Sequence, residues 1–428
     1  MLATDPRHTT YASVEATPVT LSLARRADRF PDRTAVVDIS EDRLYAPAET
    51  IHEDRVSYGA LSAIADRTAE RLATLGIGPG DTVCLVTRNR VATLGLFFAC
   101  RRLGATLAPV SHLLTPASVE RPFDVLEPEI VVAEAAQRDL VRSIPFDRSV
   151  TLAELSETDR AGIEVDARRP GESPLLALHG ESGRPIAGYE SETLERNCRT
   201  ATAVWGLTAD DVVPVTTRLS APDALVRVAL SVLYAGGTLL LDRAFDPGDA
   251  ATAIAEEGAT LLPGREAVLR DIAAEPGFDA AAASLERAVC AAPVDGNVID
   301  AYRDRDVPVA RVYGRLECPT ALSEGFADDD RARDADESSV GRPVPDCRAR
   351  LVDDDAVLEG AAEGRLQLSG PVVADGYVSA AGTDDGGREE STDRESADDD
   401  SDRGRFLDGW FDTGDRFHRD GAGCYHLR

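Results

Sequence analysis

The sequence predicts an α/β fold of two wound α/β subdomains with mainly parallel sheets, plus a small antiparallel β unit. Segments with helical spacing of apolar residues alternate with short apolar strands, and glycine or proline breaks separate them. After residue 338 the pattern changes to short alternating strands joined by turns. We therefore place the first subdomain at 1–165, the second at 166–337 and the β unit at 338–428.

The first subdomain shows the alternation most clearly. Apolar residues recur at helical spacing through residues 57–75, and the segment GIGPGD then ends this predicted helix. TVCLV follows as a short buried strand, residues 91–103 predict the next helix, and ATLAPVS predicts the next strand. This order is typical of a parallel sheet that helices cover.

The second subdomain resumes the same alternation after about residue 170. LSVLYAGGTLLL predicts a helix, a turn and a strand, ATAIAEEG predicts a helix, and strands are predicted for ATLLP, LERAVCAA and ARVYG. In the β unit, short strands are predicted for CRARLVDDDA, EGRLQLSGP and GWFDTGDRFHRDGAGCYHLR. Residues 380–405 are rich in acids and nearly free of apolar residues, which predicts a disordered or solvated insertion; an acidic binding tail is the alternative.

The charge excludes several classes of partner. Lys and Arg number 46 against 76 Asp and Glu, the net charge is −30, and every one of the basic residues is arginine. So acidic a chain repels nucleic acid and anionic membranes, so neither is expected as a partner. Acids spread along the whole chain predict a surface adapted to high salt, with a halophilic source; the alternative is an acidic protein from a high-GC genome.

The cysteines and apolar segments predict a cytoplasmic protein. The seven cysteines are scattered and never spaced as CxxC, which argues against disulfides or zinc and for a reducing compartment. The N-terminal segment lacks the basic region and apolar core of a signal peptide. The longest apolar stretch, ALVRVALSVLYAGGTLLL, contains an arginine and two glycines, so no membrane span is expected.

The segment HGESGRP, residues 179–185, has the composition of a phosphate-binding loop. Gly180 and Gly183 allow a close backbone approach, and Ser182 adds a hydroxyl. The spacing does not fit a Walker loop, because no Gly-Lys-Ser/Thr follows. Taken alone, the segment is more typical of a polar surface turn.

Further segments then follow in a recognisable order: VYGRLE (312–317), SVGRPVP (339–345), EGRLQLSGPVVADGYVS (363–379) and GWFDTGD (409–415). Together with HGESGRP they make the chain resemble the adenylate-forming (AMP-binding) acyl-CoA synthetase family, over roughly residues 20–427. The resemblance implies the large N-terminal domain of such enzymes. It also implies a reaction in which a carboxylate attacks the α-phosphate of ATP and a thiol, usually of coenzyme A, then displaces AMP.

The resemblance implies a role for each matching residue. The phosphates would lie against the loop formed by His179, Gly180, Glu181, Ser182, Gly183 and Arg184. Ala292 and Pro293 would lie beside the adenine and acyl groups, and Tyr313 with Gly314 would lie near adenine. Glu317 would be the catalytic acid that helps to hold Mg²⁺, and Asp415 would accept hydrogen bonds from the ribose hydroxyls. The alternatives are a solvated charge for Glu317 and a turn residue for Asp415.

The chain also departs from the family pattern. Leu178, His179 and Glu181 replace hydroxyl-rich positions, and Ile186 replaces the loop lysine. Glu181 puts negative charge where phosphates are expected, and Arg184 occupies a variable position, so we expect a weakened grip on phosphate. Thr216 and Thr217 stand where the family often has an aromatic–histidine pair along its acyl tunnel; Leu219, Ala221 and Leu225 could line that region or be plain core.

The implied function is an AMP-forming ligase that uses ATP, Mg²⁺, coenzyme A and a small-molecule carboxylic acid. In the family a hinge and a C-terminal lid domain of roughly one hundred residues follow, with a second catalytic lysine. The present sequence ends at YHLR. We therefore expect the lid to be absent, adenylation to be impaired, and a separate C-terminal domain or a homo-oligomer to be a candidate partner. The alternatives are a non-catalytic nucleotide- or acyl-binding relative, an aryl-acid (o-succinylbenzoate-type) CoA ligase, and an adenylation domain that feeds a carrier protein.

Overall fold

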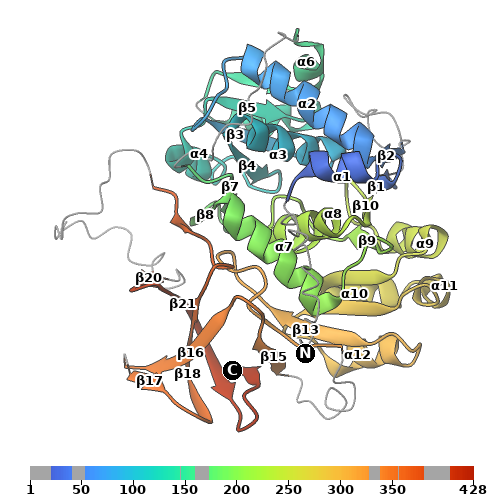
Figure 1. The fold of residues 1–428 in the computed structure, drawn as a ribbon, viewed down its shortest axis with the longest axis vertical. Coiled ribbons are helices and arrows are strands. Elements are labelled where there is room, and N and C mark those ends of the chain that lie inside the picture. The colour runs from blue at the N-terminus through green and yellow to red at the C-terminus, as the bar shows by residue number, and fades with distance from the viewer. Residues whose placement is uncertain are drawn as a thin grey trace, which may run out of the picture.

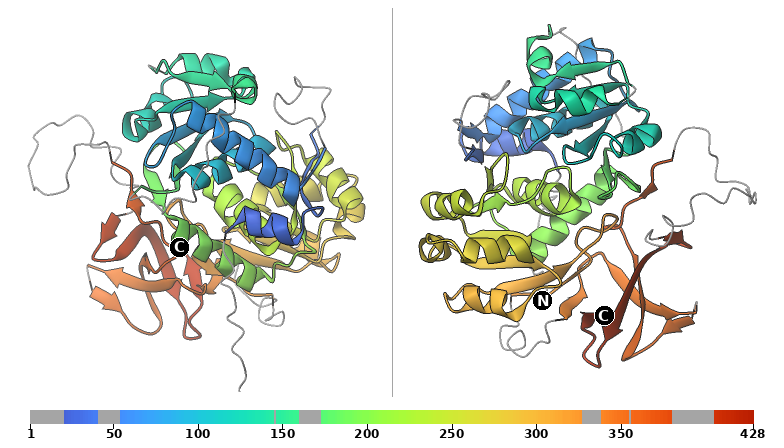
Figure 2. Two further views of the ribbon diagram at one scale, coloured as in Figure 1. Left: turned by 45° about the horizontal axis from the view of Figure 1, so that its top comes forward. Right: turned by 180° about the vertical axis from the view of Figure 1, so that it is seen from behind.

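The computed structural model describes residues 21–40, 54–144, 146–159, 173–326, 338–354, 356–379 and 405–428. Their strands form three sheets, of seven, four and eleven strands. The seven-stranded sheet lies at one end of the molecule and the antiparallel strands of the largest sheet lie at the other (Figures 1 and 2). The predicted acidic insertion at 380–405 falls outside the described residues except for its last residue.

The seven-stranded sheet has the order β19-β8-β7-β4-β3-β5-β6. Strands β3 to β7 are parallel, and β8 and β19 are added antiparallel at one edge. The strands are β3 (Thr82–Thr87), β4 (Thr106–Ser111), β5 (Ile130–Ala133), β6 (Ser149–Thr151), β7 (Leu176–His179), β8 (Ile186–Tyr189) and β19 (Gly376–Tyr377). The helices of this region are α1 (Leu23–Arg29), α2 (Tyr58–Thr74), α3 (Val91–Leu103), α4 (Glu120–Leu126), η1 (Ala135–Gln137), α5 (Arg138–Arg142) and α6 (Leu152–Glu157).

Local sequence explains the first helices well. The Ser57 side chain caps α2 by accepting a hydrogen bond from Ala60 N at 3.1 Å, and the helix ends just before Gly76, whose φ is +86°. Nearly every residue of α3 is buried, because the helix lies in the main apolar cluster. The predicted helices at 57–75 and 91–103 and the strands TVCLV and ATLAPVS are thus confirmed as α2, α3, β3 and β4.

The four-stranded sheet has the order β2-β1-β10-β9. It joins two N-terminal strands to two strands from the middle of the chain, and β1, β10 and β9 are parallel. The strands are β1 (Thr34–Asp38), β2 (Arg55–Ser57), β9 (Val212–Val215) and β10 (Thr238–Leu241). The segments α7 (Ser191–Trp205), the π-helical η2 (Asp223–Leu230) and α8 (Ser231–Ala235) belong to this part of the chain.

The largest sheet combines parallel and antiparallel strands. β11, β12 and β13 are parallel, and β14 and β15 then connect them to the antiparallel strands at the C-terminal end. The strands are β11 (Leu261–Arg265), β12 (Arg287–Ala291), β13 (Val309–Tyr313), β14 (Leu322–Ser323), β15 (Ser339–Pro343), β16 (Arg348–Asp353), β17 (Ala356–Leu358), β18 (Ala362–Ser369), β20 (Arg405–Leu407), β21 (Trp410–Arg419) and β22 (Tyr425–Leu427). The helices α9 (Pro247–Glu257), α10 (Glu266–Ala273), α11 (Phe278–Ala282) and α12 (Gly296–Arg303) stack along one side of the parallel strands (Figure 1).

Strand pairing crosses the expected subdomain limits. β7 and β8 follow residue 166 but pair within the first sheet, while β1 pairs with β10 of the expected second subdomain. The antiparallel strands after residue 338 continue the sheet that begins at β11. The limits at 165 and 337 therefore do not separate the sheets, and whether the three units behave as domains stays a prediction.

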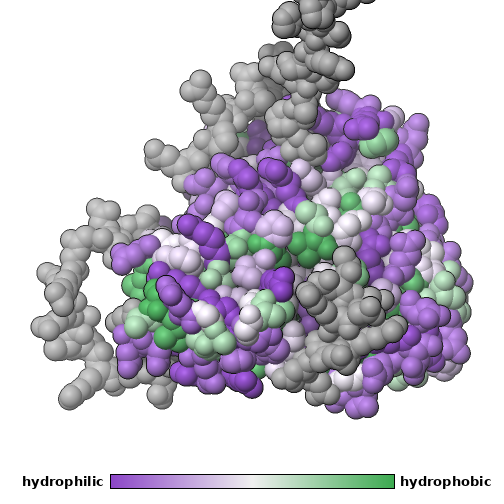
Figure 3. Space-filling view, turned by 60° about the horizontal axis from the view of Figure 1, so that its bottom comes forward, coloured by the Kyte–Doolittle hydropathy of each residue, from purple (hydrophilic) through white to green (hydrophobic). Residues whose placement is uncertain are grey.

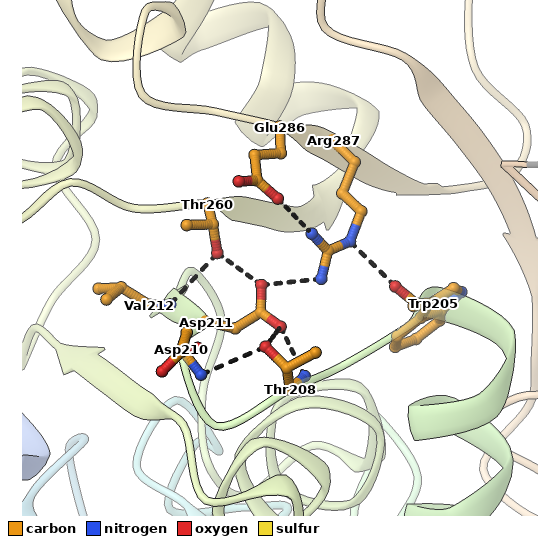
Figure 4. Close-up of polar contacts among 8 residues, drawn as sticks. All are labelled: Trp205, Thr208, Asp210, Asp211, Val212, Thr260, Glu286 and Arg287. Atoms are coloured by element: carbon orange, nitrogen blue, oxygen red, sulfur yellow. Dashed lines mark hydrogen bonds and ion pairs between the residues drawn. The ribbon is translucent and has the colours of Figure 1, made fainter. Parts of the chain in front are cut away.

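A buried polar network fixes the amino ends of three strands (Figure 4). Asp211 Oδ1 accepts from Thr260 Oγ1 at 2.6 Å and from Arg287 Nη2 at 2.8 Å, while Asp211 Oδ2 accepts from Thr208 N at 2.7 Å. Arg287 Nε also donates to Trp205 O at the end of α7, at 2.9 Å. Because these residues precede or begin β9, β11 and β12, the network holds the amino ends of these strands together and leaves their carboxyl ends to the opposite side.

A second buried ion cluster lies at the carboxyl end of β5. Glu134 is almost fully buried and pairs with Arg88 Nη2 at 2.7 Å and with Arg90 Nη2 at 2.5 Å. Burial by itself raises the pKa of Glu134, but the hydrogen bonds from both arginines outweigh it and lower the pKa to about 2. Glu134 therefore stays charged at neutral pH and compensates two arginines of the β3–α3 connection.

The surface carries the acidic character of the sequence. On the face shown in Figure 3, hydrophilic residues surround a narrow band of apolar ones. Large side chains that are apolar and exposed are few within the described ranges: Leu113, Val357 and Leu407. None of the described helices combines the length and apolarity that crossing a bilayer requires.

We expect Glu134→Gln to lower the free energy of unfolding by about 3–5 kcal/mol at pH 7, because it leaves Arg90 buried without a countercharge. Denaturant unfolding measures this difference. The depressed pKa of Glu134 contributes stability above its ordinary pKa of 4.5, and this contribution is lost as the pH falls toward 2. The difference in the free energy of unfolding between wild type and Glu134→Gln should therefore become smaller as the pH falls from 4.5 toward 2.

Asp139→Asn is the control, since this carboxylate is fully exposed and, within the described residues, pairs with Arg142 alone, at 3.6 Å. It should change stability by less than about 0.5 kcal/mol. A similar loss of stability in both variants would contradict the assigned role of Glu134. So would a stability difference between wild type and Glu134→Gln that stays the same at low pH.

Candidate functional site

The carboxyl ends of the strands carry the residues singled out in the sequence. β7 leads into loop 179–185, β12 leads into the CAAP segment at 290–293, and β13 leads into VYGRLE. Arg265 at the end of β11 pairs in register with Ala291, and Ala291 pairs with Val312. Because β11, β12 and β13 are parallel, the segments that follow them lie at one edge of the sheet, where α/β proteins bind ligands.

The loop 179–185 is a tight hairpin connection between β7 and β8. Gly180 N donates to Pro185 O at 2.9 Å, and Gly183 N donates to Gly180 O at 3.0 Å. A Cβ atom on Gly180 would lie 2.6 Å from the carbonyl oxygen of Arg184, and Gly183 has a φ of +92°. Both positions therefore require glycine, and the loop has the close backbone that the sequence predicts.

Three backbone amides of this loop remain available for a ligand. The N–H groups of Glu181, Ser182 and Arg184 have no hydrogen-bond partner among the described residues. Free amides in a tight glycine-containing loop are the donors that a bound anion uses. The Ser182 hydroxyl donates to Arg184 O at 3.3 Å, so it stabilises the loop in this conformation.

His179 anchors the loop and has no free ring nitrogen. Its Nε2 accepts a hydrogen bond from Ser111 N at 2.9 Å, and its Nδ1 donates to Gly180 O at 2.6 Å. Burial lowers the pKa of His179, and the nearby Arg218 lowers it further, so the ring is neutral. The side chain therefore ties the loop to the end of β4, and only its backbone can contact a nucleotide.

The charged side chains of the loop lie away from its centre. Arg184 pairs with Asp124 of α4 at 3.4 Å, so its guanidinium faces α4. Glu181 pairs with Arg265 of β11 at 3.6 Å. Ile186 begins β8 and packs into a buried apolar cluster, so the position that the family pattern fills with lysine is a core position in this structure.

Asp415 receives contacts from two elements. Tyr313 Oη donates to Asp415 Oδ2, and Arg315 Nη1 lies 3.5 Å from the same oxygen. Asp415 N donates to Thr413 Oγ1 at 3.1 Å, which fixes the strand backbone at this point. Burial and the Asp415 carboxylate raise the pKa of Tyr313 well above its ordinary value, so the hydroxyl stays protonated and donates. Asp415 Oδ1 has no partner within the described ranges and remains an acceptor for a ligand hydroxyl.

Glu317 is a buried carboxylate that a tyrosine holds in place. Tyr377 Oη donates to Glu317 Oε1 at 2.6 Å, and Ala374 N donates to the Glu317 backbone oxygen at 2.6 Å. Burial raises the pKa of Glu317, and the hydrogen bond from Tyr377 opposes this effect. The predicted alternative of a solvated charge is wrong, because only 4% of this residue is exposed.

Strand β8 connects Glu317 to loop 179–185. Tyr377 of β19 pairs in register with Ala187, the second residue of β8 after the loop. Tyr189, at the end of β8, donates through its hydroxyl to Leu316 O beside Glu317. Asp415 is also near enough to Glu317 to contribute to its raised pKa. The structure therefore brings the loop, the acid at 317 and Asp415 into one region.

The remaining predicted residues lie beside this region. Ala292 N donates to Val312 O at 2.9 Å, and Ala292 packs against the apolar cluster that contains Tyr313; Pro293 follows it at the end of β12. A Cβ atom on Gly314 would lie 2.0 Å from Pro319 O. The turn itself therefore requires this glycine, whatever binds nearby.

The region predicted for the acyl group contains a small cavity with a mixed polar and apolar lining. A cavity at the carboxyl ends of β9 and β11 is lined by Thr216, Thr217 and Asp223 among others. Leu219 and Leu225 are buried in the main apolar cluster, as the core alternative predicted.

Sequence reasoning missed three residues of the site. Arg315 and Tyr377 lie inside segments that carried the resemblance, so their position next to Glu317 and Asp415 was a usable signal. Arg265 lies outside every quoted motif, and no signal in the sequence pointed to it.

Comparisons with known proteins identify the family and the fold. The family described as AMP-binding enzyme matches residues 23–180 and 190–378, and the match does not include 181–189 or Asp415. A feruloyl-CoA synthase from Amycolatopsis sp is 28% identical over 380 residues, which cover 87% of this chain and 73% of the relative.

Solved structures share the fold. The N-terminal domain of FACL13 from Mycobacterium tuberculosis superimposes with a TM-score of 0.78 at 21% identity, covering 95% of this chain and 98% of that domain. An O-succinylbenzoate coenzyme A synthetase from Bacillus subtilis, in complex with ATP and magnesium ion, gives a TM-score of 0.76 at 19% identity. The superposition covers 95% of this chain and 78% of the synthetase. The predicted fold class, the large N-terminal domain of acyl-CoA synthetases, is thus confirmed.

We expect Asp415→Asn to weaken AMP binding by about 10- to 100-fold, because a hydrogen bond to a charged acceptor contributes about 1.5–3 kcal/mol. Isothermal titration with AMP measures the change. The asparagine retains one acceptor oxygen but loses the charge that Tyr313 and Arg315 face.

Glu363→Gln serves as the control, since this half-exposed acid of β18 makes only a surface pair with Arg416 at 3.7 Å. It should bind AMP as the wild type does. Equal affinities of wild type and Asp415→Asn would remove Asp415 from the site.

Proposed function

The chain belongs to the AMP-binding enzyme family, and from this premise we propose that it is an AMP-forming acid–thiol ligase. One carboxylate oxygen of the acid attacks the α-phosphorus of ATP, and pyrophosphate leaves with the electron pair of the broken P–O bond. The thiol of coenzyme A then attacks the acyl carbon, and AMP leaves. The single observation that carries this proposal is the linked set of loop 179–185 after β7, Tyr313 and Glu317 at and after the end of β13, and Asp415 within β21.

The adenosine end of the nucleotide is assigned to Asp415 and its partners. The free Oδ1 of Asp415 suits a ribose hydroxyl, while Tyr313 and Arg315 hold Oδ2. A carboxylate is suited to this contact because it offers acceptor oxygens and no donor. Fixing the carboxylate in advance reduces the ordering that nucleotide binding requires.

Magnesium fits the single carboxylate of Glu317. Tyr377 occupies Oε1, and Oε2 has no partner in the described part of the chain. No group of three or more potential ligands is present among the described residues. A single carboxylate is compatible with Mg²⁺, which proteins usually bind through one or two carboxylates together with substrate phosphates and water. When bound, the ion would offset negative charge on the phosphates; Glu317 would hold it beside the turn that carries Tyr313.

Loop 179–185 supports phosphate binding through its backbone. The free amides of Glu181, Ser182 and Arg184 are the donors, and the hairpin keeps them in place before a ligand arrives. Both aryl and fatty acids are candidate substrates, because relatives are named for a feruloyl substrate and for a long-chain fatty acid. The family's C-terminal lid domain, as a separate partner, and a cytoplasmic location also remain predictions.

A non-catalytic nucleotide-binding protein is the second candidate function. Two observations favour it: Glu181 adds negative charge at the phosphate loop, and Ile186 is buried where the family pattern has a lysine. Losing one preorganised charge contact typically lowers the rate by about 10²- to 10³-fold. Such a protein would bind Mg-ATP without forming an acyl-adenylate.

We expect the wild type to release pyrophosphate from Mg-ATP in the presence of coenzyme A and one acid of a panel of fatty and aromatic acids, and Glu317→Gln to reduce the rate by about 10²- to 10³-fold. The glutamine oxygen still accepts from Tyr377, so the fold should be kept. Pyrophosphate release is followed in high potassium chloride, and a thermal shift with ATP is recorded in parallel.

Asp271→Asn, at a half-exposed surface position of α10, is the control and should retain full activity. A thermal shift with ATP but no turnover on any acid favours the non-catalytic candidate. No shift and no turnover at any salt concentration would reject both.

A further inference from the structure

Glu181 presents a physical problem for a phosphate loop. Glu181 lies in loop 179–185, whose unpaired amides are available to a ligand. Its side chain is largely exposed. An anion beside a polyphosphate raises the free energy of binding unless a cation offsets it. The loop's own arginine does not serve, because Arg184 pairs with Asp124 on α4.

The cation that faces Glu181 comes from a different sheet. Arg265 Nη1 lies 3.6 Å from Glu181 Oε1, and Arg265 Nη2 lies 3.4 Å from Asp223 Oδ2 of η2. The Arg265 side chain is 53% exposed, so it is not locked into either pair. Among the described residues, this is the ion pair that Glu181 makes.

The position of Arg265 places it at the mouth of the site. It ends β11 and is in register with Ala291, within the CAAP segment, and Ala291 is in register with Val312, directly before Tyr313. Asp223, its second partner, also pairs with Arg227 Nη2 at 3.0 Å. Arg227 Nε in turn donates to Pro319 O at 2.8 Å, within the turn that carries Glu317.

These contacts form a continuous charged bridge from loop 179–185 to the turn of Glu317. The bridge contains two carboxylates, Glu181 and Asp223, and two guanidiniums, Arg265 and Arg227, so its charges cancel. Arg227 is buried and bonded to backbone, whereas Arg265 is exposed and bonded only to side chains. Arg265 is therefore the member of the bridge that can reorient toward a ligand.

From this arrangement we propose that Arg265 is the charge-compensating residue of the phosphate loop: it neutralises Glu181 and contacts the β- and γ-phosphates of ATP when nucleotide binds. This inference deepens the proposed function and rests on it. A guanidinium suits the task, because its planar set of donors can engage a carboxylate and a phosphate oxygen together. Arg265 on β11 would thus provide the positive charge that is missing on β8, where Ile186 replaces the lysine of the family pattern.

The proposal is tested by titrating Mg-ATP, AMP and pyrophosphate into wild type, Arg265→Gln, Arg265→Lys and Glu181→Gln by calorimetry. Arg265→Gln should weaken Mg-ATP and pyrophosphate binding by about 10- to 100-fold while changing AMP binding less than about threefold. Arg265→Lys, which keeps the charge, should recover part of the loss. Glu181→Gln should tighten Mg-ATP binding, because it removes the repulsive carboxylate and releases Arg265.

A double variant separates charge compensation from a structural role. If Arg265 acts partly through Glu181, then Arg265→Gln should weaken Mg-ATP binding less in the Glu181→Gln background than in wild type. The effect should also decrease as potassium chloride is raised, because exposed charges are screened. Arg142→Gln is the matched control, since this exposed arginine of α5 lies outside the loop and pairs with Asp139 at 3.6 Å; it should leave Mg-ATP affinity unchanged.

Each outcome decides the matter. Equal loss of AMP and Mg-ATP binding in Arg265→Gln would overturn the proposal, and so would a loss of Mg-ATP binding in Arg142→Gln as large as that in Arg265→Gln. So would unchanged Mg-ATP affinity in Arg265→Gln while the wild type binds ATP. If the wild type binds neither Mg-ATP nor AMP, it is the proposed function that fails. Thermal unfolding without nucleotide checks that the four single variants are folded.

Discussion

The antiparallel pairing of β19 with β8 is the contact on which the candidate site depends. β8 directly follows the phosphate loop, and β19 carries Tyr377, which holds the Glu317 carboxylate. Backbone pairing sets the register of the two strands, and a shift by one residue would turn Tyr377 to the opposite face of the sheet. The distance between loop and acid is therefore controlled by main-chain hydrogen bonds and not by flexible side chains.

Charge compensation is the second constraint, because carboxylates dominate this chain. Each acid near the site has its own donor: Tyr313 and Arg315 for Asp415, Tyr377 for Glu317, and Arg265 for Glu181. Glu317 is the most buried of the three, and the donor it receives is a neutral hydroxyl. Its carboxylate is thus less neutralised than that of Asp415, which suits a residue assigned to a metal ion. The absence of lysine from the sequence leaves arginine as the source of positive side-chain charge.

Polar groups that stabilise the fold and polar groups that can bind a ligand lie in different parts of the molecule. At the amino ends of β9, β11 and β12, the buried Asp211 is hydrogen-bonded to the partly buried Thr260 and Arg287. At the carboxyl ends, the amides of loop 179–185 and one oxygen each of Glu317 and Asp415 remain open to a ligand within the described residues. Buried polar groups that are fully paired rigidify a structure, whereas unpaired groups at an opening can bind.

The sequence by itself determined the local elements and the order of the motifs. The helical spacing of 57–75 and 91–103 predicted α2 and α3, and the antiparallel strands after residue 338 were predicted from their short alternating pattern. Periodicity and turn residues act over a few neighbours, so they can be read without a structure. The residues of HGESGRP, VYGRLE and GWFDTGD were likewise visible as candidates.

Only the tertiary structure decided which of these candidates meet and how they are paired. The pairing of β1 with β10 crosses an expected boundary, Arg184 turns to α4, and Arg265 approaches Glu181 from another sheet. These are contacts between residues far apart in the chain, and their free energy depends on packing and on the distance between charges after folding. No local pattern encodes such a distance, and for that reason Arg265 was invisible in the sequence.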